Sequence, residues 1–202
     1  MSTKKVQDGA PALVPAVYPM QMEACADIIL TAPADCCVVV AKTTDTFVRL
    51  RVLPTPAGIC RILDARFGPM GWCRRHYNCG SALYCSIGIY NPVTGDYLHK
   101  DAPAHDDYIG GDKATLQDAS SFAHAAALWG ICEDVLALPA ITFTAQQVEI
   151  QPVPDARNPQ RIASYRMRQI LTVDKFARKE DGTVAAVQYK DQDGKVAAVW
   201  QR

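Results

Sequence analysis

Residues 71–101, GWCRRHYNCGSALYCSIGIYNPVTGDYLHKD, decide the fold of this chain. Two clusters of turn-forming residues, one around Gly80 and one around Pro92, divide the stretch into three extended runs. Aromatic and β-branched residues fill these runs, as is typical of strands. The runs cover 71–77, 83–90 and 97–101. The stretch therefore predicts a three-stranded antiparallel meander.

One helix is predicted before the meander in the sequence and one after it. Thr55 followed by Pro56 is typical of a helix N-cap and a first helical residue, and the helical spacing after them stops at Gly68. After the meander, residues 113–131 are rich in alanine, contain no proline and place small residues on one closely packing face. This second segment is the predicted main helix.

Further strands are predicted toward both ends of the chain, from short apolar or alternating runs. They cover 27–30, 36–42, 46–52, 141–150, 170–178, 183–189 and 195–200. The predicted fold class is α+β: an antiparallel β-β-β-α core, in which the Ala-rich main helix packs on the three-stranded meander, plus N-terminal strands and a C-terminal β meander.

The chain is divided by composition into three parts. Residues 1–20, with three prolines among small residues, are predicted to be an irregular N-terminal arm. Residues 21–151 form the predicted core domain, and residues 152–202 the predicted linker and small C-terminal β meander. The linker itself is placed at 152–159, where prolines recur.

The composition is that of an ordinary globular protein. The chain has 202 residues, of which 49% are hydrophobic and 21% are charged. No apolar run reaches the roughly 18 to 20 residues that span a bilayer, and the first residues lack the apolar core of a signal peptide. We therefore expect a cytoplasmic protein with no membrane partner.

The charge is zoned along the chain although its formal sum is zero. Six arginines stand against one acidic residue between 49 and 77, and seven acidic residues stand against one lysine between 101 and 134. Between 157 and 179, seven basic residues stand against one acidic residue. Such zones suit a basic groove for a phosphate backbone, or zones that complement each other within the fold or between subunits.

Common catalytic motifs are absent from the sequence. It contains no phosphate-binding glycine loop, dinucleotide-binding motif, serine elbow or His-Glu-x-x-His pattern. Its eight cysteines include no Cys-x-x-Cys pair, so most are expected to be small buried residues. We expect no metal, no cofactor and no covalent catalysis. One enzymatic hypothesis stays open, a thiol or metal-dependent enzyme that uses Cys73, His76 or His105 with Asp106 and Asp107.

The order of elements, together with two short motifs, resembles the Rad-fifty-two superfamily of single-strand annealing proteins, especially its short phage and bacterial members. Residues 61–72, RILDARFGPMGW, are similar to the family's Arg-Leu-Asp helix followed by Gly-x-x-Gly-Trp. Residues 120–127, SSFAHAAA, are similar to its Asp-Ala-Phe-Lys-Arg-Ala-Ala segment. The resemblance extends from Thr46 to Ile141.

Two departures from the family pattern remove positive charge. The family's Lys-Arg pair on the main helix is replaced here by Ala123 and His124. The Gly-Arg-Tyr that usually follows is replaced by Cys132, Glu133 and Asp134. If family members hold phosphates through those positions, this chain must use other residues or bind weakly.

The resemblance implies a protein of homologous recombination and DNA repair that binds single-stranded DNA and anneals complementary strands without ATP. It also implies a homo-oligomer, either a ring or a helical filament, and a single-strand binding protein or an exonuclease as a further partner. The alternative is an interaction or regulatory module that keeps the fold without binding DNA. Candidate DNA-binding residues are Arg74, Arg75, Tyr77, Lys100, Arg49, Arg51, Arg61, Arg66 and His124.

Strand alternation sorts the most informative of these residues by face. Arg74 and His76 are expected on one face of the first meander strand, and Arg75 and Tyr77 on the other. Arginine suits single-strand binding because its planar fork holds phosphate oxygens and stacks on rings. Arg75 with Tyr77 is one candidate pair, and Arg74 with Lys100 is the competing one.

Overall fold

The computed structural model describes residues 30–105 and 112–202. The predicted arm at 1–20 and most of the predicted strand at 27–30 lie outside the described residues. The elements, in chain order, are the 3-10 helix η2 (Pro33–Asp35), β1 (Cys36–Thr43), β2 (Phe47–Pro54), α1 (Pro56–Phe67), β3 (Trp72–Cys79), β4 (Ala82–Asn91), β5 (Asp96–Pro103), α2 (Lys113–Ala127), α3 (Glu133–Leu136), β6 (Ile141–Thr144), β7 (Ile150–Pro154), β8 (Ile162–Met167), β9 (Thr172–Arg178), β10 (Val184–Lys190) and β11 (Val196–Gln201).

The helix signals in the sequence act locally, and they are confirmed. Thr55 caps α1, since its hydroxyl oxygen accepts the backbone N–H of Gly58 at 3.0 Å, and Pro56 is the first helical residue. The chain leaves α1 at Gly68, where φ is 76°. The main helix α2 ends at Ala127 rather than at residue 131 as predicted, because the chain turns there and passes through Gly130 with φ of 72°.

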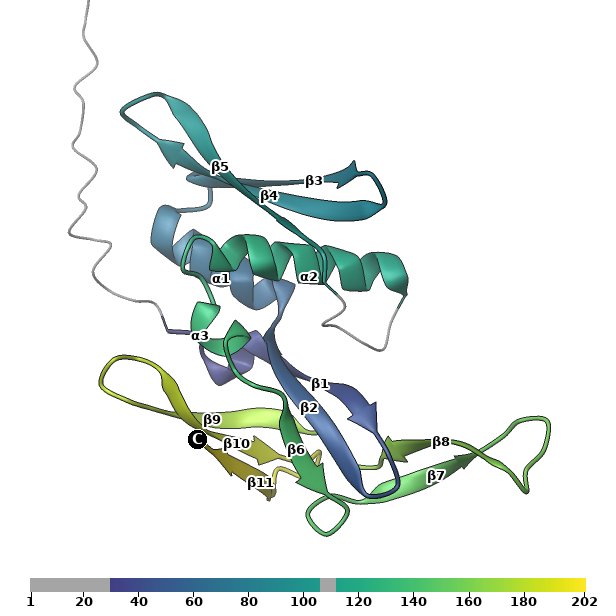
Figure 1. The fold of residues 1–202 in the computed structure, drawn as a ribbon. Helices are drawn as coiled ribbons and strands as arrows, with labels where there is room; N and C mark the ends of the chain where they lie inside the picture. Colours follow the sequence, from purple (N-terminus) through teal and green to yellow (C-terminus); the bar gives the residue numbers. More distant parts are fainter. Residues whose placement is uncertain (1–29, 106–111) are drawn as a thin grey trace, which may run out of the picture.

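The meander is confirmed as a sheet in the order β3-β4-β5, and it lies over α1 and α2 (Figure 1). The first hydrophobic core fills the space between this sheet and the helices. Ile87 of β4, Phe122 of α2 and Ile62 of α1 are fully buried there. Trp72 and Trp129 pack against this core and are partly buried.

A second core lies below the helices. The sheet β1-β2-β6 faces the sheet β9-β10-β11, and apolar residues of β2 such as Leu50 lie in one cluster with Val187 and Tyr189 of β10. Phe143 of β6 packs edge-on against Tyr189, with ring centroids 5.7 Å apart. The predicted C-terminal meander therefore shares a core with strands from the N-terminal part of the chain.

The linker predicted at 152–159 is wrong. These residues complete strand β7 and enter a hairpin in which β7 pairs with β8 in antiparallel register. Pro152 and Pro154 suggested a loop, but proline is tolerated in a hairpin at the edge of a structure, where its missing N–H faces no partner strand. The hairpin projects from the body of the protein (Figure 1).

The fold class is α+β with antiparallel three-stranded sheets, as predicted. The layers run from the β3-β4-β5 sheet through the two long helices to the pair of lower sheets (Figure 1). Within the described parts of the chain, none of the helices has the length and apolar character needed to cross a bilayer. The upper sheet is the element that positions the candidate site.

Candidate nucleic-acid interface

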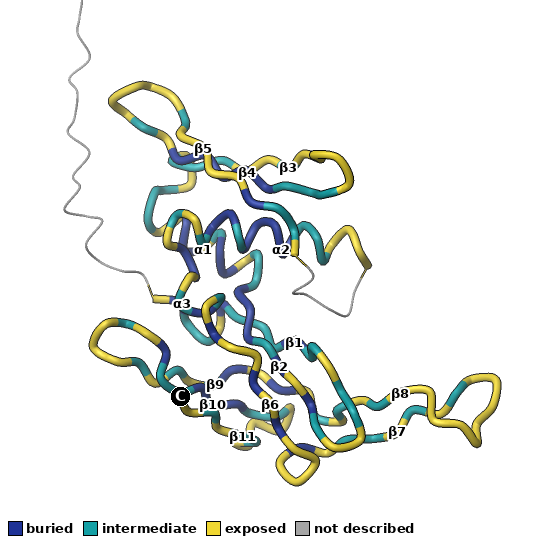
Figure 2. The backbone as a smooth tube through the Cα atoms, in the orientation of Figure 1, coloured by how far each residue is buried: buried dark blue, intermediate teal, exposed yellow. Residues whose placement is uncertain are grey.

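The β3-β4-β5 sheet has one face on the helices and one face that no other described element covers (Figures 1 and 2). Arg74 and His76 of β3 contact α2 on the inner face. Tyr77 contacts Tyr84 and Asp101 on the opposite, outer face. The predicted alternation of these residues between two faces is therefore confirmed.

Arg74 and His76 on the inner face are engaged with α2. The Arg74 guanidinium lies 4.4 Å from the centre of the Phe122 ring, and its Nη1 is 4.0 Å from Asp118 Oδ2. Nε2 of His76 lies 3.3 Å from Asp118 Oδ1. Burial lowers the pKa of His76, an effect that the nearby Asp118 carboxylate opposes and the Arg74 charge reinforces. At neutral pH this ring therefore adds no positive charge to the sheet.

Lys100, the other inner-face candidate, closes the end of α2. Its Nζ lies 4.4 Å from the centre of a Trp129 ring and donates a hydrogen bond to the carbonyl oxygen of Leu128 at 2.7 Å. A cation at the C-terminus of a helix compensates the unpaired carbonyl groups there. The charge of Lys100 is thus used inside the fold, as is that of Arg74.

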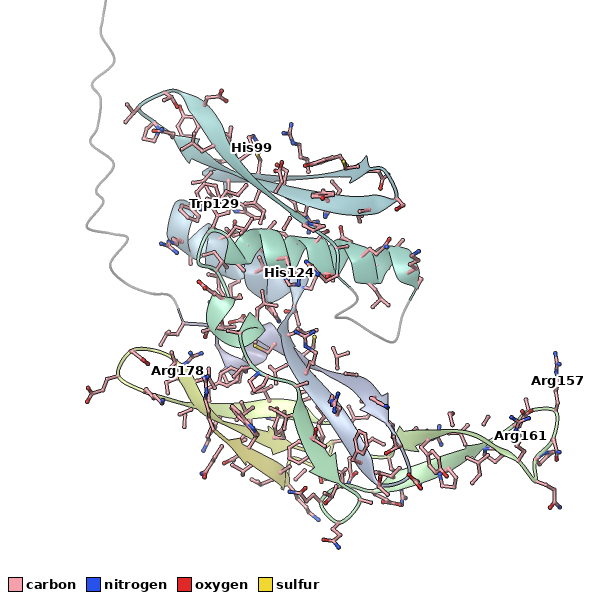
Figure 3. The ribbon with its side chains drawn as sticks, in the orientation of Figure 1. His99, His124, Trp129, Arg157, Arg161 and Arg178 are labelled. Atoms are coloured by element: carbon pink, nitrogen blue, oxygen red, sulfur yellow. The ribbon has the colours of Figure 1, made fainter. Side chains whose placement is uncertain are left out.

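The outer face carries two groups of rings, which together come from all three strands. Tyr77 and Tyr84 stack with centroids 5.6 Å apart, and Tyr90 meets Tyr97 edge-on at 5.5 Å. The ring of His99 lies 6.4 Å from that of Tyr97. Tyr77 and Tyr90 are exposed to solvent. Figure 3 labels His99 on this sheet. Aromatic rings on an open sheet are a platform on which bases of a single strand stack.

A hydrogen-bonded network fixes the polar groups of the outer face. Asp101 accepts hydrogen bonds from the hydroxyl of Ser86 and, at 2.9 Å, from that of Tyr77, and these two donors, with the nearby Arg75 charge, hold the pKa of Asp101 below its usual value. The bond to Asp101 raises the pKa of Tyr77 in turn. Ser86 Oγ also lies 3.1 Å from Nδ1 of His99.

Gly88 in the central strand provides room for this arrangement. A Cβ atom at Gly88 would lie 2.6 Å from Cε1 of His99 and 2.9 Å from Sγ of Cys73. The imidazole and the thiol therefore close over the glycine from the two neighbouring strands. Ring and thiol are held next to each other only because residue 88 has no side chain.

Two predicted DNA-binding arginines are engaged elsewhere. Arg61 makes two charge-assisted hydrogen bonds to Asp35, one of them from Nε to Oδ1 at 2.8 Å, and Asp35 is only 4% exposed. Nη1 of Arg66 lies 3.5 Å from the carbonyl oxygen of Trp129. Neither arginine is on the sheet that carries Arg75.

The remaining candidates lie on the lower sheet and on α2. Arg49 lies on the exposed side of β2, where its guanidinium and the Lys42 ammonium each lie 5.9 Å from the centre of the Phe47 ring. Arg51 follows on the same side, because alternate residues of β2 are buried in the lower core. His124 packs against His105 with ring centroids 4.2 Å apart. Of the nine predicted residues, the structure brings only Arg75 and Tyr77 together on the outer face.

Four residues of the outer face were not predicted from the sequence. These are Tyr84, Tyr90, Tyr97 and His99. The signal was present in β4, where Cys85, Ile87 and Ile89 alternate with tyrosine, serine and glycine. Strict alternation in a strand with one buried face places the intervening residues on the open face.

The thiol enzyme hypothesis does not survive for the pair Cys73 and His76. Their side chains lie on opposite faces of β3, since Cys73 borders Gly88 on the outer face and His76 approaches α2. Asp106 and Asp107, the acids proposed to work with His105, lie outside the described residues. In residues 30–105 and 112–202 no three histidine, cysteine, aspartate or glutamate side chains form a metal-binding group.

Comparisons with known proteins add no relative. No protein-family model matches the chain, and neither does any curated protein or solved structure. The candidate interface therefore rests on the geometry of the outer face.

Proposed function

We propose that the chain binds single-stranded DNA on the outer face of the β3-β4-β5 sheet. The observation that supports the proposal is the uncovered pair of ring groups, Tyr77 with Tyr84 and Tyr90 with Tyr97 and His99, on the face that also carries Arg75. Bases have π-faces whatever their sequence, so stacking on such rings holds a strand without selecting one sequence. Arg75 supplies a charge for the backbone, which stacking alone lacks.

The second part of the proposal is that the bound strand is annealed to its complement without ATP. This step rests on the resemblance to single-strand annealing proteins. It needs a long track on which many bases stay unpaired and accessible, and one sheet of three strands is only about 10 Å wide. Many copies of the chain, in a ring or a helical filament, supply the length that one copy lacks.

A second candidate function is an interaction or regulatory module that does not bind DNA. Two observations favour it. The Asp101 carboxylate lies near Arg75 and offsets its charge. The main helix also has Ala123 and His124 where the family pattern has lysine and arginine; Ala123 is fully buried and His124 packs on His105. An open sheet rich in tyrosine also suits a protein partner.

Adjacent arginines on opposite faces of one strand give a matched test. We would measure fluorescence anisotropy of a labelled oligothymidine with the wild type, Arg75→Gln and Arg74→Gln at low and high salt. Both variants lose one charge and keep most of the side-chain stem. Arg75→Gln is expected to weaken binding about fivefold at about 0.1 M salt and to reduce the salt slope by about 0.7, because one phosphate contact with a single strand is lost. Arg74→Gln is expected to bind like the wild type.

Tyr77→Leu tests the stacking surface. Loss of one stacked base costs about 1–3 kcal/mol, so an affinity loss of about fivefold or more is expected. If only Arg74→Gln weakens binding, the strand follows the inner side of the sheet. If a folded wild type does not bind oligothymidine at low salt, the DNA proposal is overturned and the interaction module remains. Fluorescence quenching with complementary dye-labelled strands, without ATP, then tests annealing.

A further inference from the structure

The hairpin of β7 and β8 leaves the body of the protein without a covering layer. Ile150 and Met167 at its base pack against the lower core. Beyond this base, every residue from 156 to 164 is exposed, and the apolar side chain of Ile162 is 49% exposed. A two-stranded hairpin is marginally stable alone in water, because it lacks a hydrophobic layer of its own. We therefore expect this exposed arm to bind a partner.

Hydrogen bonds hold the tip of this arm in one shape. The Asp155 carboxylate accepts the backbone N–H groups of Arg157 at 2.8 Å and Asn158 at 3.4 Å. A turn centred on Pro159 is closed by the N–H of Arg161, which donates to the carbonyl oxygen of Asn158 at 2.9 Å. Figure 3 shows Arg157 and Arg161 at the outer end of the hairpin. Both arginines are thus presented on an ordered tip.

The arm is basic along its length. Between residues 150 and 167 it contains three arginines, Arg157, Arg161 and Arg166, and a single acidic residue, Asp155. The oxygen of Asp155 that the structure engages is bonded to backbone N–H groups of the tip. A polyanion is the ligand that this charge fits.

The shape of the arm favours duplex DNA over other polyanions. Two paired strands lie about 4.8 Å apart, so a ribbon with its side chains fits the roughly 12 Å major groove of a DNA duplex. Arginines on a ribbon inside a groove reach the phosphates that border it. A single strand offers no groove for this ribbon to enter.

We propose that the β7–β8 hairpin is an arm that binds duplex DNA. This site is separate from the outer face of the upper sheet, which carries His99 and lies at another end of the molecule (Figure 3). An annealing protein has duplex DNA as its product, so the arm would bind that product. Only the identification of the duplex as an annealing product rests on the function proposed above.

Anisotropy of a short labelled duplex tests the arm. The test variant is Arg157→Gln/Arg161→Gln, and the control is Lys175→Gln/Lys195→Gln, which removes two exposed cations from the C-terminal meander. Loss of two phosphate contacts is expected to weaken duplex binding about 60-fold at about 0.1 M salt and to lower the salt slope by about two. The control variant is expected to change affinity far less, and oligothymidine binding by the arm variant is expected to stay at the wild-type level.

Other outcomes overturn the assignment. An equal loss in the arm and control variants means that only net charge matters. Unchanged duplex binding, with a lower mass for the arm variant in light scattering, makes the hairpin a contact between copies of the chain. A parallel loss of duplex and oligothymidine binding means that the arm belongs to the single-strand path. Failure of the outer-face proposal is recognised separately, because Arg75→Gln leaves the arm intact.

Discussion

The imidazole of His99 occupies the space beside Gly88 in which a side chain of the central strand would lie. The separation from a Cβ atom placed at Gly88 to Cε1 of His99 would be 2.6 Å. The position of the ring, its bond to Ser86 and its closeness to Tyr97 all follow from the missing side chain. The open face of the sheet is therefore shaped by its central glycine as much as by its tyrosines.

Gly88→Ala is expected to displace His99 and Cys73 at a modest cost of about 1 kcal/mol in the free energy of unfolding, since both obstructing groups are side-chain ends that can move. Gly58→Ala in α1 is the comparison, because its Cβ would lie 2.6 Å from the backbone oxygen of Asp35, which cannot move as easily. We expect a loss of about 3 kcal/mol there. Urea denaturation of both variants checks the order, and a larger loss for Gly88→Ala would contradict it.

Local signals explain which parts of the fold were predictable. The ends of α1 depend on Thr55, Pro56 and Gly68, which act on their immediate neighbours, and the meander depends on turn residues next to its strands. The hairpin at β7 was missed because Pro152 and Pro154 suggest a loop unless the edge position of the strand is known. The packing of the C-terminal meander on β2 depends on contacts between distant residues, which periodicity does not reveal.

The candidate site was predictable where it depends on local geometry, and not where it depends on distant partners. Alternation along β3 separated Arg75 from Arg74 correctly, because the period of a strand is fixed by its geometry. The engagement of Arg61 with Asp35 and of Arg66 with Trp129 joins residues 26 and 63 positions apart. A sequence shows that such arginines are present, but their partners are set by tertiary structure.

The pair of Arg61 and Asp35 predicts a pH-dependent stability. Hydrogen bonds from Arg61 lower the pKa of the Asp35 carboxyl, while burial opposes them. A lowered folded-state pKa stabilises the protein above the usual carboxyl pKa near 4, and this stabilisation is lost as the pH falls through the lowered value. Arg61→Gln is expected to cost about 2 kcal/mol at neutral pH, less than for a fully buried pair because Arg61 is 54% exposed on its side chain.

Urea denaturation of the wild type and Arg61→Gln at pH 7 and at about pH 3 checks this. The difference between the two proteins is expected to shrink at the lower pH, because the stabilisation is lost as the pH falls through the lowered pKa of Asp35. A difference that stays constant with pH would show that Arg61 stabilises α1 by packing alone. Oligothymidine binding by the folded variant is expected to match the wild type.

Removal of the Asp101 charge is expected to strengthen DNA binding. The carboxylate lies near Arg75 and its pKa is held low by Ser86 and Tyr77, so it stays ionised at neutral pH and offsets the arginine. Asp101→Asn keeps an acceptor for Tyr77 and frees one net positive charge, which corresponds to an affinity gain of about fivefold at about 0.1 M salt for a single strand. The readout is oligothymidine anisotropy.

Asp181→Asn is the control for that gain, because it removes the same charge from the β9–β10 turn, where Asp181 is likewise hydrogen-bonded through Thr183. It is expected to change oligothymidine affinity little. An equal gain in both variants would mean that only the net charge of the protein is felt. A loss of affinity for Asp101→Asn would place the DNA away from the outer face.

The lower core contains a polar group that its packing does not satisfy. Tyr189 is fully buried, and among the described residues its hydroxyl has no hydrogen-bond partner, so burial raises the pKa of the phenol. Tyr189→Phe keeps the edge-on contact with Phe143 and removes the unpaired hydroxyl. We expect the free energy of unfolding to rise by about 1 kcal/mol at neutral pH.

The raised pKa of Tyr189 also predicts a pH dependence. The folded-state stabilisation that a raised pKa provides is complete below the ordinary tyrosine value near 10 and is lost as the pH rises above it, so the wild type should lose stability there while the variant does not. Urea denaturation at pH 7 and at about pH 10.5 measures both effects, and a variant less stable than the wild type at pH 7 would show that the hydroxyl is satisfied in solution.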